Sequence, residues 1–173
     1  MNFLNTNYEK EEFQNVTDFW KTILNKEFSE CIFKKCDFSW VDFSWTIFTN
    51  CKFLNCNLSN INVTNCSFQD VYFEKSKLVW INFSLINTFI LTLSFKNCLV
   101  NICNFNQLSL NGTNFIDCTI NDSDFVNTDL SKSDFSNSNL KWTKFIDSDL
   151  SNVNFITSLN YYIDPTRKNL NCA

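Results

Sequence analysis

The sequence predicts an all-β protein, a four-sided parallel β-helix. Three observations predict it: an apolar residue at every fifth position, a column of small residues two positions earlier, and like residues at a spacing of twenty. The stretch NDSDFVNTDLSKSDFSNSNLKWTKF shows the first, with large apolar residues at Phe125, Leu130, Phe135, Leu140 and Phe145. An α-helix repeats its apolar face about every 3.6 residues and a strand about every 2. A period of five therefore belongs to neither.

The period runs through most of the chain in two segments. All 25 repeat centres are apolar, and they hold 16 of the 20 phenylalanines. The first segment has its centres at Phe28, Phe33, Phe38, Phe43, Phe48, Phe53, Leu58, Val63, Phe68, Phe73, Leu78 and Phe83. The second has them at Phe95, Val100, Phe105, Leu110, Phe115, Ile120, Phe125, Leu130, Phe135, Leu140, Phe145, Leu150 and Phe155. The positions two residues before the centres, from Cys31 to Val153, hold only Cys, Ser, Thr, Val, Ile or Leu.

Two inward residues in every five require the chain to turn a corner at each repeat. Four corners make a square coil of twenty residues, with successive coils paired like parallel strands about 4.8 Å apart. The composition supports four sides, because Phe105 then stacks under Phe125 and Phe145, while Leu110 stacks under Leu130 and Leu150. The 28 asparagines suit the corners, since Asn tolerates the left-handed backbone region.

The segments outside the repeat predict three further parts. Residues 1–27 precede the repeats, and Val16, Phe19, Trp20, Ile23 and Leu24 recur at helical spacing after a Thr17 or Asp18 N-cap, which predicts a short capping helix over 16–24. The repeats span 28–158 and a tail covers 159–173. The frame breaks at 84–94, where Phe83 and Phe95 lie twelve residues apart. The break is either a packed bulge or a recognition loop, and its apolar residues favour the bulge.

Composition excludes several classes of function. Histidine is absent, which removes the commonest general base and metal ligand. No catalytic, metal or cofactor site is recognisable, so we expect no enzyme activity. The net charge of −4 makes nucleic acid an unsuitable direct partner. No run approaches the roughly 18 apolar residues of a membrane span, and no secretory signal begins the chain. The expected location is the cytoplasm, away from membranes.

The nine cysteines leave three interpretations open. Eight of them occupy the small inward column: Cys31, Cys36, Cys51, Cys56, Cys66, Cys98, Cys103 and Cys118. Pairs twenty residues apart come close enough for disulfides, and cysteines also bind metals. A reduced ladder of small core residues is favoured, because free Cys packs like a small hydrophobe and the cytosol is reducing.

Two sets of outward residues are candidate binding sites. Trp40, Trp45, Trp80 and Trp142 occupy the last position of their repeats, with Trp40 and Trp80 on the same face. They either lie flat on their neighbours or form a protein-interaction patch. Asp124, Asp129, Asp134 and Asp149, like Asp37 and Asp42, directly precede their centres. These either hold the corners by hydrogen bonds or present an acidic face.

This pattern resembles the pentapeptide-repeat family, whose motif is A(D/N)LXX, over about residues 28–157. Here Cys, Ser and Thr replace the usual Ala, and Phe dominates the centre. The resemblance implies a right-handed quadrilateral β-helix of about six coils. The end, LNYYIDPTRKNLNCA, is similar to the tail after the last coil in quinolone-resistance (Qnr-type) and microcin-immunity-type members. Those members continue into a dimerisation helix that we do not find here, so a homodimer is left open.

The Qnr-type resemblance implies a DNA mimic that binds DNA gyrase or topoisomerase IV and protects it from quinolones or toxins. We expect Asp124, Asp129, Asp134 and Asp149 to form its acidic face. Duplex DNA as long as six coils carries roughly 18 negative charges, whereas this chain carries a net −4, so the mimicry would be of shape more than of charge. The alternative is a rigid scaffold for an unrelated protein partner, engaged through the tryptophans.

Overall fold

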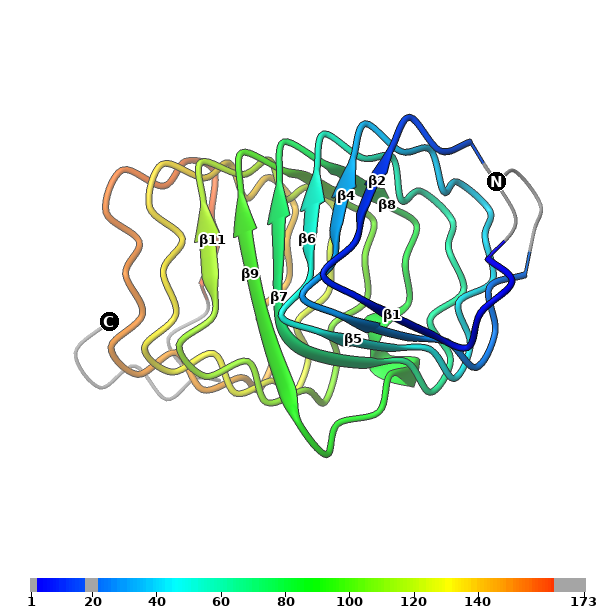
Figure 1. Cartoon of the computed structure of the whole chain (residues 1–173). Helices are drawn as coiled ribbons and strands as arrows, with labels where there is room; N and C mark the ends of the chain where they lie inside the picture. Colours follow the sequence, from blue (N-terminus) through cyan, green and yellow to red (C-terminus); the bar gives the residue numbers. More distant parts are fainter. Residues whose placement is uncertain (1–2, 18–21, 164–173) are drawn as a thin grey trace.

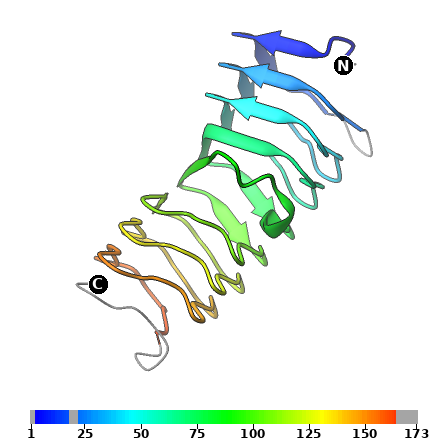
Figure 2. The ribbon, with the colours of Figure 1, turned by 90° about the horizontal axis from the view of Figure 1, so that it is seen from below.

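The computed structural model describes residues 3–17 and 22–163, and it is a parallel β-solenoid whose coils stack along one axis (Figure 1). Figure 2 shows the same stack from below, with the blue N-terminal coils at one end and the orange C-terminal coils at the other. The described residues contain short strands, isolated bridges and one 3₁₀ turn, without an α-helix. The all-β solenoid predicted from the sequence is confirmed.

Most strands have three residues because the chain turns after each one, whereas β7 continues around a corner at Asp70. The elements are β1 (Asn7–Glu9), β2 (Glu12–Gln14), β3 (Glu27–Ser29), β4 (Ile32–Lys34), β5 (Ile47–Thr49), β6 (Lys52–Leu54), β7 (Ser67–Glu74), β8 (Lys77–Val79), η1 (Phe83–Leu85), β9 (Leu91–Lys96), β10 (Leu99–Asn101) and β11 (Asn114–Ile116). The ladder β1-β3-β5-β7 forms one side and β2-β4-β6-β7 the next, since β7 runs along both. Strands β8 and β10 pair on a third side. After β11 the sides continue as single parallel bridges, such as Asp129 with Asp149.

The spacing of partners confirms four sides. Tyr8 pairs with Phe28, and Phe28 with Phe48, in a register of twenty residues. Across the frame break the register becomes 22, with Phe73 opposite Phe95, and it returns to twenty when Phe95 pairs with Phe115. The two additional residues therefore lengthen one coil without changing which residues stack.

The corners lie in the left-handed backbone region. From Lys10 to Thr157 a residue with φ of 49–69° recurs, five positions apart over most of the chain and two places after a centre or its equivalent. Asn is the residue found there most often, as its tolerance of this region predicts. The single glycine, Gly112, has φ +69 and is one of these corners.

Stacked phenylalanines fill the interior. One column holds eight rings, with neighbouring centroids 4.6–5.5 Å apart and nearly parallel: Phe13, Phe33, Phe53, Phe73, Phe95, Phe115, Phe135 and Phe155. The adjacent column of Phe105, Phe125 and Phe145 meets it edge to face. Each such aromatic pair contributes about 0.5–1.5 kcal/mol beyond its buried area.

The small inward column carries hydrogen bonds as well as volume. Its thiols and hydroxyls donate to the carbonyl oxygen of a repeat centre in the preceding coil, as Ser138 Oγ does to Phe115 O at 2.6 Å. The other donors of the column include Cys31, Cys36, Thr46, Cys51, Cys56, Cys66, Ser76, Cys98, Cys103, Ser123, Thr128, Ser133, Thr143 and Ser148. Cys, Ser and Thr are interchangeable here because each is small and each can donate.

The N-terminal prediction is corrected where the structure describes it. The residues that border 18–21, Thr17 and Thr22, form parallel bridges to Asp37 and Asp42 rather than helical turns, and residues 18–21 themselves lie outside the described part. Strands β1 and β2 already belong to the solenoid, which thus begins before Phe28. Phe3 packs its ring against Tyr8, Phe13 and Phe28 at this end. The predicted tail, 159–173, is described only to Ile163.

The packed-bulge prediction for the frame break was only partly right. Ile86 and Leu93 are buried, as a packed bulge requires. However, the chain projects from the coils between η1 and β9, at the bottom of Figure 1, and Phe89 is 90% exposed. The two additional residues leave no inward position for that ring, so the break is a surface loop anchored on both sides.

The aromatic column predicts a large cost for truncation at its middle. Phe115 is fully buried between Phe95 and Phe135, so Phe115→Ala is expected to lower the free energy of unfolding by about 3–5 kcal/mol. Urea unfolding followed by circular dichroism measures the loss. The control is Ile146→Ala at a partly exposed outward position, and equal losses for both variants would show that the stack is not the main source of stability.

The hydrogen-bonded column predicts that donor capacity matters more than volume. Ser138 Oγ donates to Phe115 O and accepts from the Cys118 N–H at 2.8 Å. Ser138→Ala leaves both backbone groups buried and unpaired, and we expect it to cost about 1–3 kcal/mol. Ser138→Cys keeps a donor and should lose less in the same unfolding measurement. Equal loss in the two variants contradicts the role of the bond.

Candidate interaction surface

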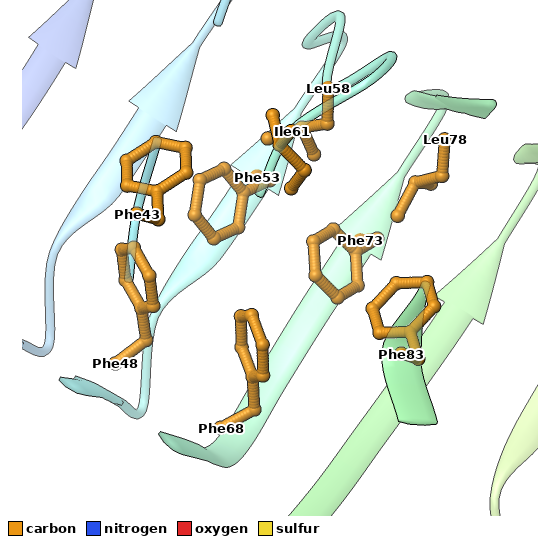
Figure 3. A pocket seen from close by; sticks show the side chains of 9 residues that line it. All are labelled: Phe43, Phe48, Phe53, Leu58, Ile61, Phe68, Phe73, Leu78 and Phe83. Carbon is orange, nitrogen blue, oxygen red and sulfur yellow. The ribbon is translucent and has the colours of Figure 1, made fainter. Parts of the chain in front are cut away.

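Apolar side chains fill the interior of the described coils. The cavity in the N-terminal half is about 10 Å³ and is lined by nine apolar side chains that face one another (Figure 3): Phe43, Phe48, Phe53, Leu58, Ile61, Phe68, Phe73, Leu78 and Phe83. A cavity of this size is at the lower limit for one water, and an apolar lining keeps it dry. Any binding site in this part of the chain has to lie on the outside.

Metal chemistry and membrane insertion find no support in the described residues. No group of three or more His, Cys, Asp or Glu side chains in the described part of the chain is placed to hold a metal ion. Within the same residues we find no helix of the length and apolarity that crossing a bilayer would need.

The cysteines form the reduced ladder that the sequence favoured. All eight in the described column are buried, and none of them forms a disulfide. Burial raises the pKa of the Cys51, Cys66 and Cys103 thiols from the ordinary 9.0 to about 12. The reactive thiolate is therefore disfavoured, and these thiols are structural donors.

Three of the four candidate tryptophans share one edge of the solenoid. The N–H of each corner residue donates to the carbonyl that precedes the next corner, from Trp40 to Ser59 O, Trp80 to Asn101 O and Asp122 to Lys141 O. The row formed in this way is 40, 60, 80, 102, 122 and 142. We call Trp40, Trp80, Ile102 and Trp142 the aromatic edge. Trp45 occupies the neighbouring corner row.

The aromatic edge combines exposure with an unfavourable backbone. Trp40, Trp80 and Trp142 are 50–67% exposed and Ile102 39%, and all four have φ of 55–64°. This region costs a residue with a Cβ roughly 1–2 kcal/mol. It is less favourable for a β-branched Ile than for Asn, the commonest corner residue. Lys141 Nζ lies 4.1 Å from the centre of the Trp142 ring, an attraction between the cation and the ring face.

The four candidate aspartates lie on three sides. Asp124, Asp129 and Asp134 each belong to a different row of bridges, and only Asp129 and Asp149 stack on one another. Asp124 is opposite Lys144, with Oδ1 and Nζ 3.1 Å apart, so its charge is offset. Asp134 Oδ1 accepts from Ser136 N and Asn154 Nδ2. The structure does not bring the four together as one acidic face.

Asp129 and Asp149, which we call the acid pair, hold their corners and keep a charge. One carboxylate oxygen of each accepts from the backbone N–H and hydroxyl of the serine two residues later, Ser131 or Ser151. The bonds from Ser151 lower the pKa of the Asp149 carboxyl. Corner bonding and outward charge thus coexist at these two positions.

Sequence reasoning missed two features of the surface. Trp142 and Ile102 join Trp40 and Trp80 only because the register across the break is 22 rather than twenty. Adding the two residues of the break to the spacing could have found them. The sequence did not indicate that Phe89, Ile90 and Leu85 are exposed, because the same apolar residue types occur at buried and at exposed positions of the break.

The sequence matches the model of a known protein family. The family model described as a pentapeptide repeat region matches residues 26–101 and 88–160, which is most of the chain. The chain belongs to the pentapeptide repeat family. No curated protein matches the sequence closely enough to count as a relative.

Solved structures of two proteins share the fold of this chain. QnrB1, a plasmid-mediated fluoroquinolone resistance protein, is 16% identical over 95% of this chain and 91% of its own, with a TM-score of 0.51. HetL, a pentapeptide repeat protein involved in heterocyst differentiation regulation in the cyanobacterium Nostoc, is 9% identical over 98% of this chain and 93% of its own, with a TM-score of 0.57. At these identities the likeness extends to the fold alone.

The buried thiols predict a loss of stability at high pH. The pKa of Cys51, Cys66 and Cys103 is higher in the folded protein, about 12, than the ordinary 9.0. Their stabilisation is therefore complete below pH 9 and is lost as the pH rises toward 12. The urea midpoint should fall over this range, and less in the triple variant C51S/C66S/C103S, whose hydroxyls donate without titrating there. Parallel pH profiles for the two proteins contradict the assignment.

Proposed function

We propose that this protein is a non-enzymatic, cytoplasmic binding protein whose partner is a type II topoisomerase, DNA gyrase or topoisomerase IV. Binding would occur on the outside of the rod and protect the enzyme from quinolones or toxins. Membership of the pentapeptide repeat family supports an interaction role. QnrB1, which shares the fold, is a plasmid-mediated fluoroquinolone resistance protein, and this supports the choice of partner.

The observation that carries the proposal is the acid pair. Asp129 and Asp149 lie one above the other on one side of a rod, and the pKa of the Asp149 carboxyl is lowered by its bonds to Ser151, so it stays charged. Two stacked charges one strand spacing apart, about 4.8 Å, compare with about 3.4 Å of helix axis per charge on one strand of duplex DNA. The net charge of −4 means that shape and this local charge, rather than the overall field, would attract a DNA-binding surface.

A second candidate function is a scaffold for an unrelated protein, bound through the aromatic edge. The observation in its favour is that Trp40, Trp80 and Trp142 stay at least half exposed at corners where their backbone is unfavourable. Stability alone would favour Asn at these positions. Exposed tryptophans are frequent anchors of protein interfaces, and a binding role accounts for keeping them.

The first proposal predicts that charge, not corner structure, is needed at the acid pair. Asn makes the same corner bonds elsewhere, as Asn57 does to Ser59, so D129N/D149N removes two charges and keeps the turns. We expect this variant to lose protection of gyrase supercoiling against ciprofloxacin while its unfolding midpoint stays the same. The matched control is Asp42→Asn, an equivalent corner in another row, which should protect normally. Full protection by D129N/D149N, or none by the unmodified protein with either enzyme, refutes the proposal.

The scaffold candidate predicts the opposite dependence. W80N/W142N replaces exposed rings by the residue that the left-handed corner favours, so the free energy of unfolding should be unchanged or rise by up to about 2 kcal/mol. The same variant should lose the partner that the unmodified protein captures, whereas D129N/D149N should retain it. Trp45→Asn, in the neighbouring corner row, is the matched control. If W80N/W142N retains every captured partner, the aromatic edge is not the binding surface.

A further inference from the structure

Exposed lysines gather along one edge of the solenoid. This edge is the corner between the side that carries β4, β6 and β9 and the side that carries β8, and the arrows of β4, β6 and β9 end beside it in Figure 1. Five exposed lysines lie on this corner or in the strands that enter and leave it. We call them the basic edge: Lys35, Lys52, Lys75, Lys77 and Lys96.

The basic edge runs along the axis of the stacked coils. Lys35 and Lys75 occupy the same corner row two coils apart, because each corner N–H in this row donates to the carbonyl before the next corner. Between Lys35 and the corner that follows Lys96 the row climbs three coils, about 14 Å at the spacing of parallel strands. One strand of duplex DNA carries a charge per about 3.4 Å. The edge therefore has the length of about four consecutive phosphates.

The charges of the basic edge are not used within the chain. None of its five lysines forms a salt bridge within residues 3–17 and 22–163, where the salt bridges involve Lys10, Lys34 and Lys144 instead. Lysines that are not neutralised by their own chain attract anions from outside it.

Carboxylates near the basic edge are fewer than its lysines. Glu12 lies 2.6 Å from Lys34 Nζ, so it offsets a lysine that is not part of the edge. Asp37 lies in the same row of bridges as Lys77, and Glu74 is opposite Lys96. Asp117 occupies the next corner of the row and ends the edge. The edge is therefore positive along its length.

The net charge of −4 does not describe this edge, because the carboxylates gather in other coils. Residues 101–160 hold seven aspartates and three lysines. In about 0.1 M salt a charge acts over roughly 10 Å, so an anion at the basic edge responds mainly to the lysines beside it. A local stripe of lysines is the electrostatic footprint of nucleic-acid binding, even where the net charge alone argues against that partner.

We propose that the basic edge binds the phosphate backbone of duplex DNA without sequence preference. Lysine meets phosphate as a point charge, and contacts to phosphates carry no sequence information. The charges follow a line, which fits a linear polyanion.

The surroundings of the basic edge favour duplex DNA over other anionic partners. Between residues 32 and 99 the exposed large apolar side chains lie on other sides and corners or in the loop at the break. The edge thus lacks the exposed aromatic rings on which the bases of a single strand stack. It also lacks the apolar residues that anchor a protein in a membrane surface.

This inference does not rest on the proposed function. The acid pair and the aromatic edge belong to other rows of the solenoid, so the variant D129N/D149N should bind duplex DNA at least as tightly as the unmodified chain. Loss of gyrase protection and loss of DNA binding are therefore expected in different variants.

Fluorescence anisotropy of a short labelled DNA duplex tests the proposal. We expect micromolar binding in about 50 mM salt, and the logarithm of the binding constant should fall against that of the salt concentration with a slope of about −3.5, as four phosphate contacts require. K35N/K75N places Asn, the commonest corner residue, at both positions. It should bind about tenfold more weakly or worse and reduce the slope by about 2.

The matched control is K10N/K132N, which removes the same charge from two corner lysines of positive φ outside the basic edge. Since these lie away from the bound phosphates, affinity should change by at most about twofold. Circular dichroism should show that both variants fold. Absence of binding at micromolar protein, full binding by K35N/K75N, or equal losses in the two variants overturns the proposal.

Two other polyanions complete the test. Vesicles containing phosphatidylglycerol present phosphates on a membrane surface, and polyglutamate presents the carboxylates of an acidic protein. Duplex DNA is expected to bind more tightly than either. Tighter binding to the vesicles or to polyglutamate would assign the basic edge to a membrane or to an acidic protein, and the proposal would then be wrong.

Discussion

The structure depends on a left-handed turn of the backbone at every corner. Each turn changes the direction of the chain at the end of one side of the coil. One side is five residues long and holds only two inward side chains. Four turns close a coil, and closure puts the next coil in register with the last. The recurrence of φ near 50–65° from Lys10 to Asn160 is thus the cause of the stacked core. Because L residues adopt this region reluctantly, the identity of each corner residue reports what else is required of it.

The interior satisfies two requirements with two columns. Large apolar centres provide the buried area and the ring stacks. The small column provides donors for carbonyls that the strand ladders leave unpaired, as Ser138 does for Phe115. A buried carbonyl without a donor is costly, which is why Cys, Ser and Thr replace one another freely while charged residues are excluded. A fold specified by residue class in this way is compatible with the 9–16% identity of the similar solved structures.

Apolar side chains fill the core of the described coils, and the candidate binding surfaces lie on the outside of the rod. The acid pair and the aromatic edge belong to different rows of the solenoid. The loop with Phe89 lies along the row of the acid pair, which runs through Ile47, Ser67, the loop and Ser109. The family likeness suggests what kind of partner to test, while the chemistry of each surface distinguishes the alternatives.

The period of five by itself determined the fold class, the four sides and the residues that stack, since two inward positions in five leave the chain no other way to bury them. Phe105 over Phe125 and the buried cysteine column followed directly. The sequence alone did not place the coils before Phe28, where Tyr8 and Phe13 continue the pattern around an interrupted repeat. The same period already places the four candidate aspartates on three sides. Only the tertiary structure decided that the coil absorbs the break as a register of 22, which brings Trp142 to the edge of Trp40 and Trp80, and that Phe89 points outward. Both depend on how the coil accommodates the two residues inserted at the break, and packing between distant segments is not encoded in any local pattern.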